Sequence, residues 1–186
     1  MRIVAGRHRG ARLEAPPGDA TRPTSDRARQ ALFDTLTGGR FDIDLNDSVV
    51  LDLFAGTGAL GLEALSRGAG RAIFVEKDRT ALAVLNRNIA HLKAGDRTLV
   101  LPQDATKLGR ARAPAALVLM DPPYRQGLVS PVLQVLLAGG WLAPDALIVI
   151  EQAKDEALDL PTGFALLDDR RYGAACFLFL RQATPE

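Results

Sequence analysis

The sequence predicts an α/β fold: a mostly parallel, doubly wound sheet that ends in an antiparallel hairpin. From residue 49 onward, short apolar runs alternate with helical stretches, which is the pattern of repeated βαβ units. A glycine-rich segment, "FAGTGALG", joins the first of these strands to the helix that follows it. The last two apolar runs, 164–173 and 175–182, are too close together for a helical crossover, so we expect them to pair antiparallel.

Five apolar runs are expected to form the parallel strands. They are rich in valine, leucine and isoleucine, as strands buried on both faces are. Their residues are 48–55, 71–77, 97–104, 115–121 and 146–152. Helices are expected at 59–68, which is closed by glycine, and at 78–92, where apolar residues recur at spacings of three and four. Before the last parallel strand, Ser130 and Pro131 predict an N-cap and a first helical position, and Gly139 and Gly140 predict the helix end.

The first 45 residues are expected to form a basic extension in front of a sheet domain that spans 46–186. "RIVAGRHRGARLEA" predicts a hairpin with a glycine-punctuated turn, and "RPTSDRARQALFDTL" predicts a capped helix. The first 30 residues hold seven arginines against three acidic residues, although the whole chain has a net charge of only +1. A basic arm on a mildly acidic body favours a polyanionic partner, and a simple solvated extension is the equal alternative.

Composition indicates a soluble globular protein, with 47% hydrophobic and 24% charged residues. No apolar run approaches the ~20 residues that a membrane span needs, and the N-terminus lacks the apolar region of a signal peptide. We therefore expect a cytoplasmic protein without membrane contact. The single cysteine, Cys176, lies in "ACFLFL" and is expected to be a small buried side chain. No Cys/His cluster predicts a metal site.

The glycine segment predicts a ligand-binding loop. Gly56, Gly58 and Gly61 have the spacing G-x-G-x-x-G, which lets a ligand approach the backbone at a helix N-terminus. That spacing alone is a weak signal, suits a nicotinamide cofactor equally well, and also occurs in ordinary strand-turn-helix connections. Asp52, four residues before the first glycine, favours a cationic aminoacyl sulfonium ligand over a pyrophosphate.

Two more acids end predicted strands. Glu76 follows the second strand, where it can accept both hydroxyl groups of a ribose. Asp104 follows the third, where it can accept from an adenine amino group, with the amide of Ala105 nearby. Each acid alone is more often a solvated strand end. Three acids and a glycine loop on consecutive strand ends are poorly explained by coincidence.

The stretch "VLMDPPYRQG" ends the fourth strand with an acid, two prolines and an aromatic residue. Proline cannot donate to a sheet ladder, so Asp121, Pro122, Pro123 and Tyr124 predict a stiff turn at the strand's end. Asp121 and the Pro122 carbonyl can each accept one hydrogen of an exocyclic amine, which orients its lone pair toward a methyl donor. Tyr124 offers a face for base stacking. We expect Asp121 to have an ordinary pKa of ~3.9, too low to deprotonate the amine before attack.

The chain resembles the bacterial methyltransferases that modify the N2 amine of one guanine in 16S ribosomal RNA, the small-subunit rRNA methyltransferase D type. The match runs from residue 2 to about residue 180. It is carried by "RIVAGRHRGARL", "TRPTSDRARQALFDTL", "LDLFAGTGALGLEALSRGA", "FVEKD", "DPPYRQG" and the closing "YG…FLFL". The resemblance implies a Rossmann-like fold, S-adenosyl-L-methionine as cofactor, 16S rRNA within the small ribosomal subunit as partner, and a monomer.

The resemblance also implies roles for residues. The expected cofactor contacts are Asp52, Phe54, Gly56, Gly58, Glu76, Lys77, Asp104 and Ala105. The expected catalytic residues, which hold the target amine, are Asp121, Pro122 and Tyr124. The expected RNA contacts are Arg7, Arg9, Arg12, Arg22, Thr24, Arg27 and Arg125. Many relatives have phenylalanine at the position of Tyr124, so its hydroxyl is not expected to be essential.

Other functions stay open on these motifs. A DNA adenine-N6 methyltransferase shares D-P-P-Y but usually carries a separate target-recognition region, for which the residues before the sheet leave little room. A protein-glutamine methyltransferase would more usually have asparagine at position 121. An NAD-dependent oxidoreductase would need a catalytic acid or base, and the only histidines are His8 and His91. A non-enzymatic RNA-binding module would not need the cofactor residues.

Overall fold

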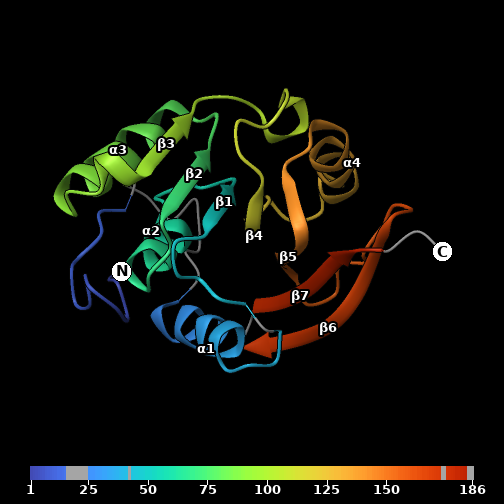
Figure 1. Cartoon of the computed structure of the whole chain (residues 1–186), viewed down its shortest axis with the longest axis horizontal. Coiled ribbons are helices and arrows are strands. Elements are labelled where there is room, and N and C mark those ends of the chain that lie inside the picture. The colour runs from blue at the N-terminus through green and yellow to red at the C-terminus, as the bar shows by residue number, and fades with distance from the viewer. Residues whose placement is uncertain (16–24, 42, 173–174, 184–186) are drawn as a thin grey trace.

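The computed structural model describes residues 1–15, 25–41, 43–172 and 175–183 (Figure 1). Its centre is a seven-stranded sheet with the order β3-β2-β1-β4-β5-β7-β6. The strands are β1 Val49–Leu53, β2 Arg71–Val75, β3 Thr98–Leu101, β4 Ala115–Met120, β5 Leu142–Ala153, β6 Phe164–Tyr172 and β7 Ala175–Gln182. Strands β1 to β5 pair in parallel, and β7 pairs antiparallel with both β5 and β6. The predicted parallel sheet and its closing hairpin are therefore confirmed.

The strand order reverses direction at β1, which lies between β2 and β4. The connections that leave β1 and β4 run to opposite faces of the sheet, and in open α/β sheets such a switch point is where ligands bind. The observed strands β1 to β4 end one to three residues before the predicted ends, where the chain enters loops, and β5 begins at Leu142, four residues earlier than predicted. These loops are the candidate ligand-binding segments.

Four α-helices cover the two faces of the sheet. They are α1 Asp26–Thr37, α2 Ala59–Ser66, α3 Arg79–His91 and α4 Val129–Gly139, with short 3-10 helices η1 Gly95–Arg97 and η2 Ala105–Lys107. Helices α1, α2 and α3 lie on one face of the sheet and α4 lies on the other (Figure 1). The apolar side chains of the first three join one core cluster, and those of α4 join the other. Cys176 is buried, as predicted. Within the described residues, no helix has the length and apolar character needed to cross a membrane.

The start of α4 differs from the prediction. Its N-cap is Leu128, which makes no side-chain capping bond, and Ser130 and Pro131 lie inside the first turn. The N–H groups of the first turn have no partner within the helix, so a proline there removes no hydrogen bond. The predicted cap at Ser130 is therefore wrong. The end is as predicted, because Gly140 adopts the left-handed conformation that closes a helix (φ +69°).

The N-terminal arm, defined as residues 1–15, folds back on itself without forming regular strands. One antiparallel bridge joins Arg2 and Arg12, and Ile3 donates to the Ala11 carbonyl at 2.9 Å. The predicted hairpin is thus confirmed only as a reversal of the chain. Ile3 and Leu13 are buried in the same core as the helices of that face. The division of the chain at residue 45 stays a prediction.

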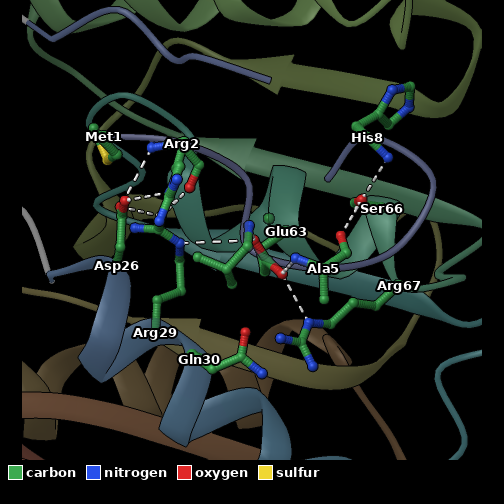
Figure 2. A network of polar contacts seen from close by, with 12 residues as sticks. Met1, Arg2, Ala5, His8, Asp26, Arg29, Gln30, Glu63, Ser66 and Arg67 are labelled. Carbon is green, nitrogen blue, oxygen red and sulfur yellow. Dashed lines mark hydrogen bonds and ion pairs between the residues drawn. The ribbon is translucent and has the colours of Figure 1, made fainter. Parts of the chain in front are cut away.

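The buried carboxylate of Glu63 on α2 anchors this arm (Figure 2). Its two oxygens accept the backbone N–H groups of Val4 and Ala5 at 2.8 and 3.0 Å. The same carboxylate faces Arg67 at 2.7 Å and Arg29 of α1 at 3.8 Å. One carboxylate therefore connects the arm, α1 and α2.

The predicted helix of residues 22–36 corresponds to α1. Its described part begins with Ser25 as the N-cap, whose hydroxyl accepts the Ala28 N–H at 3.1 Å. The buried face carries Ala28, Leu32 and Leu36. The three residues 22–24 lie outside the part of the chain that the structure describes.

Candidate active site

Acidic side chains gather at the carboxyl edge of the parallel sheet. The strand registers place Leu53, Val75, Met120 and Ile150 side by side in one row. The residues that follow three of these positions are Glu76, Asp121 and Glu151, and Asp52 precedes the fourth. Residues far apart in the sequence therefore meet at one edge, where open α/β sheets bind their ligands.

The loop between β1 and α2 has an unusual backbone. Phe54, Gly56 and Gly58 all have positive φ, of 57°, 54° and 79°. A Cβ at Gly58 would lie 2.4 Å from a Leu85 methyl group, and one at Gly61 would lie 2.4 Å from the Phe74 ring. Gly61 therefore lets α2 approach β2 this closely, and Gly58, with its positive φ, lets the start of α2 approach Leu85 of α3. The predicted approach of a ligand to these glycines stays a prediction.

Asp52 is almost fully buried beneath this loop. It is 1% exposed, and its Oδ2 accepts the backbone N–H of Gly61 in the first turn of α2 at 2.8 Å. Burial raises the pKa of Asp52 to about 8, with a further contribution from the Glu76 charge, while the Gly61 hydrogen bond opposes the rise. The side chain thus holds α2 against β1, a role that the sequence did not predict. Its contact with a cofactor amino group stays a prediction.

Glu76 connects the glycine loop to the segment after β2. Its Oε2 accepts the Gly56 N–H at 2.8 Å, and its Oε1 accepts the N–H groups of Lys77 and Asp78, each at 2.8 Å. An ionised carboxylate has about four acceptor positions, so these three bonds leave room for one more on Oε2. The partly exposed side chain is suited to receive a hydroxyl group there.

Asp104 begins the turn after β3. Its Oδ1 accepts both the N–H and the hydroxyl of Thr106, at 2.9 and 2.8 Å, and its Oδ2 faces Lys77 Nζ at 3.0 Å. These contacts, the Thr106 N–H first, lower the pKa of Asp104 to about 2. An adenine amino group would therefore share Oδ2 with Lys77. Ala105 is buried at the start of η2.

The D-P-P-Y turn follows β4 directly, beside the end of β1. The Asp121 N–H approaches the Leu53 carbonyl at 3.4 Å, and Pro122 is buried while Tyr124 is 45% exposed. Burial raises the pKa of Asp121 well above its usual range, and the carboxylates of Glu151 and Asp52 add to the rise. The ordinary pKa expected for Asp121 is therefore wrong, because the strand pattern did not show the acids on neighbouring strands.

Glu151, at the end of β5, is a candidate site residue that the sequence reading missed. It is 4% exposed, and the Tyr124 hydroxyl donates to its Oε1 at 3.4 Å. Burial raises the pKa of Tyr124 to about 12, with Glu151 as the next cause. The sequence did contain a signal for Glu151. The apolar run in "ALIVIEQ" is followed by an acid, like the apolar runs before Glu76 and Asp121. Only the pairing of β5 with β4 connects it to the site.

The predicted RNA-contacting residues divide into three groups. Arg7, Arg9, Arg12 and Arg27 are exposed, as RNA contacts require. Arg125 is also exposed, but its guanidinium makes two contacts with Asp155, at 2.8 and 3.0 Å, so RNA would have to compete with that pair. Arg22 and Thr24 lie outside the described residues.

No metal centre accompanies these groups in the part of the chain that is described. None of its His, Cys, Asp and Glu side chains form a group of three that could hold an ion. The chemistry of the edge consists instead of carboxyl groups, backbone carbonyls and one aromatic hydroxyl.

Two features define a Rossmann-like fold of the S-adenosylmethionine-dependent methyltransferase class. One is the strand order, with an antiparallel strand inserted beside β5, and the other is the glycine loop followed by Glu76. Within that class, the chain belongs to the family described as conserved hypothetical protein 95, whose sequence profile matches residues 1–181.

Similar proteins carry a more specific name. The chain is 38% identical to the ribosomal RNA small subunit methyltransferase D of Escherichia coli K12, over 100% of this chain and 92% of that protein. It is 34% identical to the Haemophilus influenzae protein of the same name, over 95% and 91%. The structure of a putative methyltransferase, yhhF, from Escherichia coli superposes with a TM-score of 0.81 at 36% identity, over 98% of this chain and 97% of that one. The family resemblance drawn from the motifs is confirmed.

Proposed function

We propose that the chain transfers a methyl group from S-adenosyl-L-methionine to the N2 amine of a guanine in 16S rRNA of the small ribosomal subunit. The observation that carries the proposal is the position of the D-P-P-Y turn after β4, beside the glycine loop after β1. The names of the similar proteins support ribosomal RNA as the substrate class. The choice of the guanine N2 amine rests on the family resemblance and on the chemistry of Asp121.

The carboxyl groups at the sheet edge fit a cationic cofactor. When bound, S-adenosylmethionine supplies a methyl group on a positively charged sulfur. The charges of Glu151 and Asp52 help to raise the pKa of Asp121, the Glu76 charge helps to raise that of Asp52, and a nearby cation offsets such repulsion. Glu76 has an acceptor position for a ribose hydroxyl, and Asp104 marks the adenine end. The donors and acceptors of this chain therefore match the ligand.

The chain's own residues act by positioning the amine. The lone pair of an exocyclic base amine is delocalised into the ring, which makes the nitrogen a poor nucleophile. An ionised Asp121 and the Pro122 carbonyl each accept one N–H, so that the lone pair points to the methyl carbon. Held by these two acceptors, the nitrogen would bond to the methyl carbon that the cofactor supplies, and the electron pair of the carbon–sulfur bond would stay on sulfur. The methylated nitrogen carries the positive charge until it loses one proton.

The raised pKa of Asp121 changes what this carboxyl can do after the transfer. A cationic cofactor favours its ionised form, which is the acceptor state that positioning needs. Because the methylated amine is a strong acid, Asp121 is suited to take up the released proton at that stage. Tyr124, whose hydroxyl is directed to Glu151, offers its exposed ring to a base that has left its stack.

The test compares two variants of Asp121. Asp121→Ala should lose turnover on the order of 10²–10³-fold, if this acceptor matters as much as an oxyanion-hole donor. Asp121→Asn keeps an acceptor oxygen and should retain clearly more activity. Both variants should still bind S-adenosylmethionine, and the assays use saturating cofactor so that a change in affinity for the cation does not alter the measured rate. Single-turnover assays on small subunits that lack the modification keep product release from masking the chemistry.

An asparagine variant as inactive as the alanine one, folded and cofactor-bound, would require the negative charge or a proton-accepting role for Asp121. The substrate itself is tested by labelled methyl transfer to small subunits, naked rRNA, DNA and protein, followed by identification of the methylated nucleoside. Label in N6-methyladenine of DNA would favour the alternative D-P-P-Y chemistry. We further propose that the protein is a monomer in the cytoplasm. Light scattering, which measures its mass in solution, tests the monomer.

A further inference from the structure

Two hollows adjoin at Arg27, near the start of α1. The first, of about 410 Å³, lies between α1 and the end of β6 and is lined by Ser25, Arg27, Ala28, Ala31, Arg171 and Tyr172. The second, of about 420 Å³, lies between the arm and α1, and its lining includes Arg2, Arg9, Asp26 and Arg27. We call the two together the α1 groove. It runs from the arm, across the first turn of α1, to the end of β6.

The groove reaches the same edge of the sheet as the candidate active site. Tyr172, the last residue of β6, pairs with Ala175 of β7, which in turn pairs with Ala153 at the end of β5. In the same way, Arg170 and Glu151 both lie opposite Phe177. The end of β6 is therefore two strands away from Glu151 along the edge that also carries Asp121.

The groove is cationic. Arg2, Arg9, Arg27 and Arg171 line it and are all exposed. Its one acidic lining residue, Asp26, is already paired with Arg2 at 3.3 Å and with the buried Arg29 at 2.8 Å. Among the described residues, no ion pair involves Arg27 or Arg171. The groove thus offers two guanidinium groups, one on each side of the first hollow, to an anionic ligand.

The first hollow is also preformed and of suitable size. Ala28 and Ala31, which contribute only methyl groups, leave it unfilled. Tyr172 is held in place because its hydroxyl bonds Thr35 Oγ1 at 2.8 Å and its ring contacts Phe177, with centroids 5.9 Å apart. The volume lies in the range of ~300–1,000 Å³ that is usual for small-ligand sites, which is enough for one nucleotide unit.

We propose that the α1 groove binds the single-stranded RNA that flanks the target nucleotide, with a phosphate held between Arg27 and Arg171. The inference rests on the proposed function, since it supplies the RNA path for that site. A base whose amine is methylated must leave its stack, so the backbone beside it is not in a regular duplex. Guanidinium groups suit such a backbone because they contact phosphate oxygens with two N–H groups at once. The arm end of the groove continues the path toward Arg9.

The test uses Arg27→Ala, Arg171→Ala and the double variant. Arg112→Ala is the matched control. Arg112 is an exposed arginine in the loop before β4, at the amino ends of the parallel strands and thus away from the candidate active site. Binding is measured at several salt concentrations with unmodified small subunits, with a short single-stranded oligonucleotide and with its duplex. Each groove variant should lose roughly tenfold in affinity for subunits and single strand, and the log–log salt slope should fall in magnitude by up to ~0.7 per contact.

Arg112→Ala should keep the wild-type cofactor affinity, RNA affinity and single-turnover rate, because Arg112 lies away from the groove and from the reacting atoms. In the groove variants, the loss should lie in RNA affinity. If the double variant binds RNA with the same affinity and salt slope as Arg112→Ala, the groove is not an RNA-binding site. The proposed function still stands in that case, provided that the wild-type protein methylates rRNA. If the duplex binds as tightly as the single strand, and the variants weaken both kinds of binding equally, the groove does not select single-stranded RNA. Absence of methyl transfer by the wild-type protein to any RNA would instead refute the proposed function.

Discussion

Asp52 and Asp121 occupy adjacent strands, and both have a pKa above that of an exposed carboxyl group. No arginine or lysine forms an ion pair with either of them among the described residues. Burying ionisable groups without a cationic partner is unfavourable for the folded apoprotein, and such groups concentrate at functional sites. The two residues therefore contribute little to stability when ionised, and their position makes sense chiefly for a ligand that carries positive charge.

This has a consequence for the pH dependence of stability. The pKa of Asp52 is about 8 in the folded protein against ~3.9 for an exposed aspartate. At pH values between these two, the folded protein keeps a proton on Asp52 that the unfolded chain releases. Its contribution to the free energy of unfolding is fully present below about pH 4 and declines as the pH rises toward 8. Asp52→Asn keeps an acceptor for the Gly61 N–H and does not titrate, so its profile should be flatter. Urea denaturation across this range measures both, and parallel profiles would show that Asp52 does not titrate there.

At the scale of elements, α3 connects the arm to the glycine loop through one buried amide. Asn88 is 1% exposed. Its Oδ1 accepts the Glu14 N–H at 2.8 Å, and its Nδ2 donates to the carbonyls of Glu14 and Thr57, at 3.2 and 2.9 Å. Thr57 stands between the two glycines of the loop. The side chain therefore satisfies three backbone groups that would otherwise lose their partners, and it does so at both the arm and the loop.

Asn88→Ala should be destabilising, because each buried backbone group left without a partner costs about 1–3 kcal/mol. It should also weaken cofactor binding, since the Thr57 carbonyl loses the bond that holds the loop. Arg87→Ala is the control on the same helix: it removes only the exposed pair of Arg87 with Glu14, whose value is about 0–1 kcal/mol. Urea denaturation and calorimetry compare the variants. Equal stability and equal cofactor affinity for both would show that the Asn88 contacts do not matter.

At the scale of the whole molecule, the N-terminal arm is part of the folded core. Glu63 of α2 binds the arm backbone and two arginines, and Ser66 accepts the His8 N–H at 2.9 Å (Figure 2). A Cβ at Gly6 would fall 1.9 Å from the Ser66 carbonyl oxygen, so only glycine permits this approach. The arm therefore presents its exposed arginines from a fixed position against α2, with Arg7 bonded to Ser66 at the C-terminal end of that helix.

Glu63→Gln tests this anchoring. The substitution leaves the buried Arg29 and Arg67 facing an uncharged side chain, and breaking a buried pair in this way costs about 3–5 kcal/mol. Asp34→Asn is the control, because Asp34 meets the same Arg67 at 3.4 Å with a side chain that is 57% exposed, and such a pair is worth about 0–1 kcal/mol. Denaturant unfolding should separate the two variants clearly. A Glu63 variant as stable as the Asp34 variant would mean that the carboxylate does not hold the arm.

The sequence by itself determined the parallel strands, the closing hairpin, the helix end at Gly140 and the acids that follow the strands. Each of these depends on a few neighbouring residues: an apolar run, a break, and a polar or glycine residue beyond it. The D-P-P-Y turn was readable for the same reason. The spacing of Gly56, Gly58 and Gly61 predicted a ligand-binding loop, and only the structure showed that the Leu85 and Phe74 side chains lie against Gly58 and Gly61.

Only the tertiary structure decided which of these groups meet. It placed Glu151 beside Asp121, directed Asp52 to the start of α2, paired Arg125 with Asp155 and joined the arm to Glu63. It also brought Arg27 and Arg171 to one groove. The physical reason is that strand order and packing bring together residues distant in sequence. The pKa of a carboxyl group and the partner of an arginine depend on burial and on neighbouring charges, which no local pattern contains.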